Sequence, residues 1–218
     1  GTSTFMVSLP NKWAKSHNLK KGQDINIEEV DSNLYISPTA YKQKKKHATI
    51  KASKESSTRS AITHAYRCGY DSIKIQYTDE NAPKYIIDIV NNYLIGFEIS
   101  KQEKDHCVIE SITEPSDEQF DILFRKIFYN ISLLIEKMIE SARDKTSFDY
   151  EEIMYKIYRY DNFCRRIASK KRLFGDDIVL FWTLSSLLMH AQRELYHVNK
   201  IMHEKKITGK SMEFLQHV

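Results

Sequence analysis

Hydrophobic and polar positions alternate in short runs over the first 38 residues of the chain, and this alternation predicts strands. Residues 4–9 are rich in types that favour strands, and they are followed by Pro10. Pro10 can open a helix, because a first-turn N–H needs no partner within the helix. Residues 25–30 and 34–36 alternate again, on either side of turn-forming residues at 31–33. We therefore predict strand, short helix, strand, turn and strand.

The short helix is predicted to be amphipathic. Its apolar face consists of four residues: Trp13, Ala14, His17 and Leu19. The Lys21-Gly22 step that follows favours a turn, because glycine adopts a positive φ at no steric cost. This turn leads into the second strand.

The order of these elements resembles the swapped-hairpin DNA-binding domain of the SpoVT/AbrB family. That family has a Leu-Pro-x-x-Trp-like motif after its first strand and a Leu-x-x-Gly-Asp-like turn before its second. The matching residues here are Leu9, Pro10, Trp13, Leu19, Gly22 and Asp24. The resemblance implies that residues 1–40 bind DNA and that two chains exchange hairpins to form one barrel, so that each chain supplies half.

A basic run at residues 41–47 is typical of a linker or of an arm that contacts phosphate. After it, residues 48–114 alternate short strand patterns with helical ones. Strands are predicted at 48–52, 71–77, 97–100 and 107–113, and helices at 55–68 and from Pro83 to about residue 94. The order βαβαββ predicts a small sheet with helices on one face, a middle unit of the α+β class.

From residue 115 to 218 the apolar residues recur at helical spacing. Ser116 is a candidate cap for the first helix, and the sequence reopens helices after Phe148 and after Gly175. Three helices joined by short turns predict an antiparallel bundle. The whole chain is therefore predicted to be of the α+β class.

The bundle segment resembles archaeal PhoU-like phosphate-uptake regulators. The similarity lies in residues 155–172, where Asp161 precedes Arg165 and Arg166. The family also carries a Glu-Arg-x-x-Asp signature on its third helix, but Gln192 and Tyr196 replace its two carboxylates here. The resemblance implies regulation of phosphate uptake, with components of a phosphate transporter as protein partners.

The net charge of +4 is distributed unevenly along the chain. Residues 1–54 contain ten lysines and four acidic residues, a net charge of +6, whereas residues 55–114 carry −4 and residues 115–218 carry +2. The positive excess thus lies on the segment that resembles a DNA-binding domain. Lysines that neutralise DNA phosphates release counterions, which favours binding.

Seven residues are candidates for contacts with DNA: Lys12, Lys15, Lys20, Lys21, Ser3, Thr4 and Ser8. Lysine contacts to phosphate position a protein on DNA without reading its sequence. The SpoVT/AbrB family usually reads DNA with arginines on and before its first strand, whereas the first arginine here is Arg59. The alternative is that this domain only dimerises.

The predicted bundle carries several residues of types that can bind a metal ion. Its candidate ligands are Glu136, Glu140, Asp161, Glu194 and His197. A bundle metal site usually needs two Glu-x-x-His pairs, and residues 194–197 supply one. We therefore favour a charged outer face and predict no metal and no cofactor. Likewise, the Ser/Thr cluster at 53–60 could bind an anion at a helix start, but ordinary capping is favoured.

No catalytic motif is found, so the chain is not predicted to be an enzyme. Three scattered cysteines fit a reducing cytosol, and no apolar run is long enough to insert into a membrane. The leading hypothesis is a cytoplasmic, homodimeric, DNA-binding regulator of transcription linked to phosphate uptake. The alternatives are a protein-interaction regulator of a phosphate transporter and, ranked last, a metal-dependent enzyme.

Overall fold

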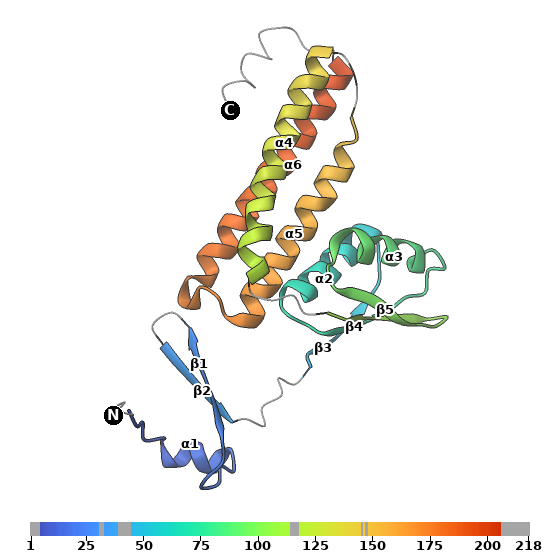
Figure 1. Cartoon of the computed structure of the whole chain (residues 1–218). Helices are drawn as coiled ribbons and strands as arrows, with labels where there is room; N and C mark the ends of the chain where they lie inside the picture. The colour runs from blue at the N-terminus through green and yellow to red at the C-terminus, as the bar shows by residue number, and fades with distance from the viewer. Residues whose placement is uncertain are drawn as a thin grey trace. The chain divides into compact units, whose positions relative to one another are not determined.

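In the computed structural model of the chain, residues 5–30, 33–38, 45–113, 118–144, 146 and 148–205 are described. The chain divides into two compact units, residues 1–44 and 45–218. Figure 1 shows the elements of each unit, and each unit is described by itself. Among the described residues, no helix has both the length and the apolar character that a membrane span needs.

The N-terminal unit contains helix α1 (Asn11–Ser16) and an antiparallel hairpin of β1 (Ile25–Val30) and β2 (Asn33–Pro38). Pro10 is the N-cap of α1, and its carbonyl accepts a hydrogen bond of 3.0 Å from the Ala14 N–H. The two predicted later strands are confirmed, and so is the helix over residues 11–16. His17 and Leu19, predicted on its apolar face, lie beyond its end, because Asn18 turns the chain with φ +52°.

The predicted strand at residues 4–9 is wrong for the described part, because residues 5–9 form no strand. A strand needs a neighbour that satisfies its N–H and C=O groups. In this unit β1 and β2 pair with each other, and no ladder reaches residues 5–9. Their strand-like composition therefore has no partner strand in the described chain.

The large unit begins with a four-stranded sheet in the order β3-β4-β6-β5. Its strands are β3 (His47–Lys51), β4 (Ser72–Gln76), β5 (Phe97–Gln102) and β6 (His106–Ser111), and its helices are α2 (Glu55–Arg67) and α3 (Ala82–Tyr93). β3 and β4 are parallel, and the other pairs are antiparallel. The predicted order βαβαββ is confirmed.

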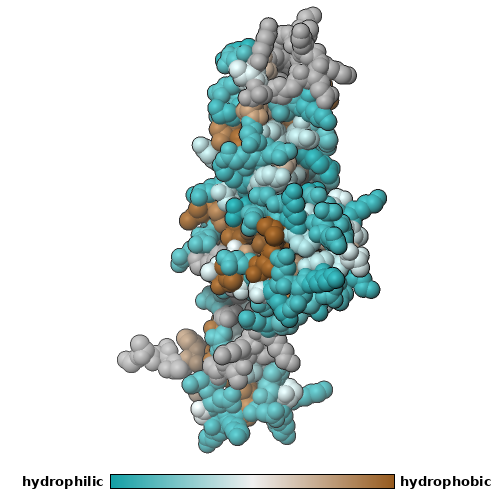
Figure 2. Space-filling view, turned by 90° about the vertical axis from the view of Figure 1, so that its right-hand side faces the viewer, coloured by the Kyte–Doolittle hydropathy of each residue, from teal (hydrophilic) through white to brown (hydrophobic). Residues whose placement is uncertain are grey.

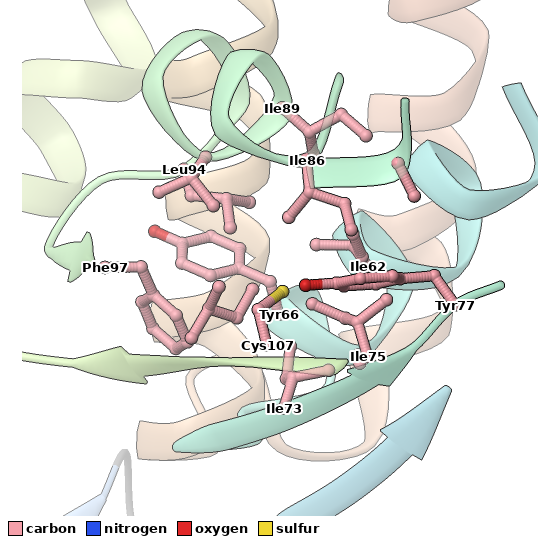
Figure 3. Close-up of a cluster of buried hydrophobic side chains, with 14 residues drawn as sticks. Ile62, Tyr66, Ile73, Ile75, Tyr77, Ile86, Ile89, Leu94, Phe97 and Cys107 are labelled. Atoms are coloured by element: carbon pink, nitrogen blue, oxygen red, sulfur yellow. The ribbon is translucent and has the colours of Figure 1, made fainter. Parts of the chain in front are cut away.

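The core of this part lies between the sheet and the two helices, as Figure 3 shows. Ile62 and Tyr66 of α2 and Ile86 of α3 pack over Ile73 and Ile75 of β4. The Tyr66 hydroxyl donates a hydrogen bond of 2.9 Å to the Ile95 carbonyl, so this buried polar group has a partner. Strand residues of period two and helix residues of period 3.6 thus form one apolar layer.

Three long helices follow: α4 (Glu118–Asp144), α5 (Tyr150–Lys171) and α6 (Ile178–Lys205), with a 3-10 turn η1 (Gly175–Asp177) before α6. They run alternately up and down, as predicted (Figure 1). The Asp149 carboxylate caps α5, because it accepts hydrogen bonds from the N–H groups of Glu151 and Glu152. The proposed cap Ser116 and the predicted boundary at 114 and 115 lie outside the described residues.

Helix α5 packs on both sides. One side contributes to the bundle core, and the other side lies against α2 and α3. The ring of Tyr93 on α3 lies 5.4 Å from Tyr155 and 5.8 Å from Tyr158, measured between centroids. Tyr155 and Tyr158 of α5 thus pack against α3. The face of the molecule shown in Figure 2 is mostly hydrophilic, with hydrophobic residues in small groups.

Candidate nucleic-acid interface

Four of the candidate lysines lie within ten positions of each other on the surface of the N-terminal unit. Lys12 and Lys15 are exposed on α1, one turn apart, and Lys20 and Lys21 are exposed in the turn that follows. Ser8 is also exposed, just before the helix. The other two candidates, Ser3 and Thr4, lie outside the described residues. Exposed ammonium groups in this number can neutralise phosphates and release their counterions.

The turn that carries Lys20 and Lys21 is held by two hydrogen bonds. The Lys20 N–H donates to Gln23 Oε1 at 3.1 Å, and the Gln23 N–H donates to the Lys20 carbonyl at 3.1 Å. Gly22 has φ +81°, which only glycine adopts readily. Local bonds therefore fix the backbone beneath these two lysines.

The end of α1 is also held by local contacts. The Ser16 hydroxyl donates to the Trp13 carbonyl at 2.8 Å, and the rings of Trp13 and His17 lie 4.8 Å apart. Asn18 then turns the chain with φ +52°, and the Leu19 N–H donates to the Ala14 carbonyl at 3.0 Å. The lysine-bearing helix is thus stabilised by its neighbours in sequence.

The N-terminal unit has no buried residue among those whose burial is described. Six of its large apolar side chains are instead exposed, and Phe5 and Met6 reach 92% and 94% exposure. The other members of this exposed set are Val7, Ile27, Leu34 and Tyr35. A lone two-stranded hairpin is marginally stable, and exposed apolar groups of this kind mark an interaction surface.

Comparison with protein families adds one finding about this unit. Residues 1–45 match the family model described as antidote-toxin recognition MazE, bacterial antitoxin. The N-terminal segment is MazE-like. The match supports the predicted SpoVT/AbrB-type domain, which fits a DNA-binding or regulatory role. No curated protein and no solved structure gave a match.

The structure does not bring the five metal candidates together. Glu136 and Glu140 are exposed on α4, and Lys137 donates a hydrogen bond of 2.9 Å to Glu140. Glu194 and His197 are exposed on α6, whereas Asp161 is buried on α5. In the described part of the chain, no three His, Cys, Asp or Glu residues are grouped to hold a metal ion.

Asp161 belongs instead to a buried ionic network between α5 and α2. Its carboxylate accepts hydrogen bonds of 3.0 Å from Arg165 Nε, and Arg67 Nη2 lies 3.7 Å away. Burial raises the pKa of the Asp161 carboxyl, and the two guanidinium groups oppose this rise. Arg67 Nε also donates to the Asn162 side chain at 2.6 Å. The charges singled out in the sequence are thus paired within the protein.

A second part of this network joins α5 to the sheet. Arg166 Nη1 donates to the carbonyls of Tyr66 and Tyr70 at 3.1 and 2.6 Å, and Nη2 donates to Asp71 at 3.2 Å. Lys170 donates to the same carboxylate at 2.6 Å. Sequence reasoning missed Asp71 and Arg67, because nothing local relates them to residues about a hundred positions later.

The favoured capping by the Ser/Thr cluster is wrong. The N-cap of α2 is Lys54, and its side chain makes no capping hydrogen bond. Thr58 Oγ1 accepts from the Ser53 N–H at 3.0 Å, and Ser60 donates to the Ser56 carbonyl at 3.0 Å. Ser60 therefore bonds back within the helix, as short polar side chains often do. Thr58 instead accepts from the residue before the N-cap.

Proposed function

We propose that the chain is a DNA-binding transcriptional regulator that dimerises through its MazE-like segment, residues 1–45. The observation that carries the proposal is the exposure of apolar residues in a unit that matches this family. MazE/AbrB-like domains typically bind DNA and dimerise. A second chain would supply the missing neighbour for residues 5–9 and cover Phe5 and Met6.

The DNA contact is assigned to the lysines of α1 and of its following turn. They are exposed and sit on locally fixed backbone, as a phosphate-contacting surface requires. The lack of arginine before Arg59 agrees with binding through phosphates more than through base edges. We place the protein in the cytoplasm, and we assign it no enzymatic activity and no cofactor.

The link to phosphate uptake rests on the resemblance of residues 155–172 to PhoU-like regulators. Asp161, Arg165 and Arg166 match that pattern, and in the structure they hold α5 against the sheet part. A helix fixed in this way could relay a signal between the bundle and the rest of the large unit. A phosphate transporter is the protein partner that the resemblance implies.

The alternative function is a protein-interaction regulator in which the MazE-like segment only dimerises. The absence of arginine from the first 58 residues favours it. The family description also names recognition of a toxin, so a protein ligand agrees with this alternative.

Fluorescence anisotropy with a labelled random-sequence duplex separates the two functions. At ~50 mM salt we expect saturable binding that weakens steeply as salt is raised, because phosphate contacts release counterions. The Lys12→Ala/Lys15→Ala chain removes four ammonium groups per dimer, which lowers the salt slope by up to about 4.

The matched control is Lys84→Ala/Lys156→Ala, which removes two exposed lysines from the large unit and should leave DNA binding unchanged. A flat titration of the wild-type chain at low salt, with the dimer intact, would reject DNA binding and favour the alternative.

A further inference from the structure

Helix α6 carries a regular row of apolar residues, all exposed except the half-buried Val198, which we call the α6 seam. Its members are Leu180, Leu184, Leu187, Ala191, Glu194, Val198 and Ile201. The spacing alternates between four and three residues throughout, and six of the seven residues are apolar. Leu184 and Leu187 are 56% and 60% exposed, so the bundle core does not cover them.

The inward side of the same helix packs in the bundle core, where Phe181 and Met189 are buried. Ser185, Gln192 and Asn199 recur every seven residues and are buried against the other helices. Gln192 donates a hydrogen bond of 3.1 Å to the Tyr150 hydroxyl, which itself donates to the Gln192 carbonyl at 2.9 Å. The bundle thus covers one side of α6 and leaves the leucines of the seam exposed.

The spacing of the seam identifies the kind of partner. A repeat of 3.5 residues keeps an apolar row facing a second helix along its whole length, whereas packing on a sheet or a flat surface does not require it. The seam covers three heptads, which corresponds to a contact ~32 Å long at 1.5 Å per residue. Three heptads are enough for a stable pair of helices.

We propose that the seams of two copies of this chain pair as antiparallel helices. Charge supports this partner and this direction. Asp176 and Asp177 are exposed just before the seam, and residues 178–189 carry no charge. The second half exposes Arg193, Glu194 and Lys200; Arg193 lies 3.9 Å from Glu194, so Lys200 provides the excess positive charge. An antiparallel pair sets the acidic start of one helix near the basic end of the other.

A parallel pair would instead set Glu194 against its own copy inside the seam and the acidic ends against each other. Like charges so placed are unfavourable. The pairing is independent of DNA binding, since none of its residues lies in the MazE-like segment. It adds a second contact between the two chains of the proposed dimer or between dimers.

Site-directed cross-linking tests the pairing and its direction. Two chains, Leu180→Cys and Ile201→Cys, are co-expressed with different tags in a Cys68→Ser background, since the other cysteines are buried. A short bismaleimide should link the two different chains efficiently. Each single chain should link to its own copy weakly, because equal positions lie ~30 Å apart in an antiparallel pair.

Substitutions by glutamate provide a second test and its matched control. Leu184→Glu/Leu187→Glu should abolish the cross-link, whereas Ile122→Glu on α4, which is also 56% exposed, should leave it unchanged. Both variants should keep the helix content of the wild type in circular dichroism, since no buried side chain is altered.

Two results would overturn the inference. One is cross-linking no faster than that of a Glu152→Cys chain, whose cysteine is exposed on α5. The other is efficient linking of equal positions, which would mean a parallel arrangement. Because the readout contains no DNA, a failed DNA titration and a failed cross-link are separate outcomes.

Discussion

The Arg166 guanidinium is almost completely buried, and its partners come from a distant part of the chain. It donates to two backbone carbonyls and to the Asp71 carboxylate, and it lies 4.8 Å from the ring centroid of Phe97. A buried pair of this kind is costly to break, because the partner left behind stays buried without its countercharge. Arg166 therefore holds α5 against the sheet part through specific bonds as well as by apolar contact.

Replacing Arg166 by alanine should lower the free energy of unfolding of the large unit by about 3–5 kcal/mol. Arg166→Lys should recover little of this loss, because an ammonium group cannot form the same forked set of bonds. Urea denaturation followed by circular dichroism measures both. The control is Lys156→Ala, which breaks an exposed pair with Glu152 and should cost about 0.5 kcal/mol or less. Equal losses in Arg166→Ala and in this control would contradict the assignment.

Asp71 should make the stability of the large unit sensitive to acid. Burial alone would raise the pKa of Asp71, but hydrogen bonds from Lys170 and from the Lys46 N–H hold it below its ordinary value of 3.8. The unfolded chain therefore binds the proton more readily than the folded one. The stabilisation is present above the ordinary pKa and is lost as the pH falls through the lowered value.

Melting temperatures of the wild type and of Asp71→Asn test this prediction. The difference between the two should be largest near neutral pH and should shrink between about pH 4 and pH 2. Asp161 acts in the opposite direction, because its pKa is raised in the folded state. A difference that stays constant over the acid range would show that the Asp71 charge does not stabilise the fold.

At the scale of helices and strands, local sequence patterns predicted most of the fold. Apolar residues that recur every 3.6 positions predicted the three bundle helices. Asp149 marked the start of α5, and Gly175 marked the break before α6. The alternation in β4 was equally clear. Such signals are local, so one sequence suffices to read them.

The remaining features depend on contacts between distant residues. The strand predicted at residues 4–9 has no partner within the described chain, and the ionic network joins residues about a hundred positions apart. Spacing within each helix could not show which faces meet. It therefore could not show that Asp161 is buried whereas the other four metal candidates are exposed. The exposure of the candidate lysines could be predicted from the sequence, because lysine side chains are usually exposed.

The turn before β5 should depend on a glycine. Gly96 has φ +73°, and a Cβ there would lie 2.5 Å from the Thr113 carbonyl oxygen, which belongs to the backbone. Gly96→Ala should lower the free energy of unfolding by roughly 2 kcal/mol or more, since the backbone strain and the clash add.

Gly69→Ala is the matched comparison for this glycine. Gly69 also has a positive φ, but its Cβ would meet the flexible side chain of Lys170, which can move. The alanine variant of Gly96 should therefore be the less stable of the two in urea denaturation. The reverse order would show that the contact with Thr113 relaxes easily.

At the scale of the whole molecule, the two units differ in how they are stabilised. The large unit has two apolar cores of its own, whereas the MazE-like segment has no buried residue among those described. A dimer is the simplest way to give that segment a core. Residues that are almost fully exposed in the single chain should then be essential for forming the dimer.

Phe5→Ser/Met6→Ser tests this consequence. Neighbouring residues of a strand point to opposite faces, so one of the two must face the core of a paired barrel. The variant should lose the N-terminal dimer in analytical ultracentrifugation and at least tenfold in DNA affinity, although both side chains are exposed in the single chain. The control Ile122→Ser, which alters a 56% exposed apolar residue of the large unit, should keep both properties. Wild-type behaviour of the double variant would contradict a swapped dimer.

The most direct measurement is native mass spectrometry of the protein with a short DNA duplex. The Leu184→Glu/Leu187→Glu chain is used, so that pairing through α6 cannot add further chains. We predict two chains on each duplex, and a much smaller fraction of complex when Lys12 and Lys15 are also replaced by alanine. A complex with one chain per duplex, or no complex at ~50 mM salt, would contradict the proposed DNA-binding dimer.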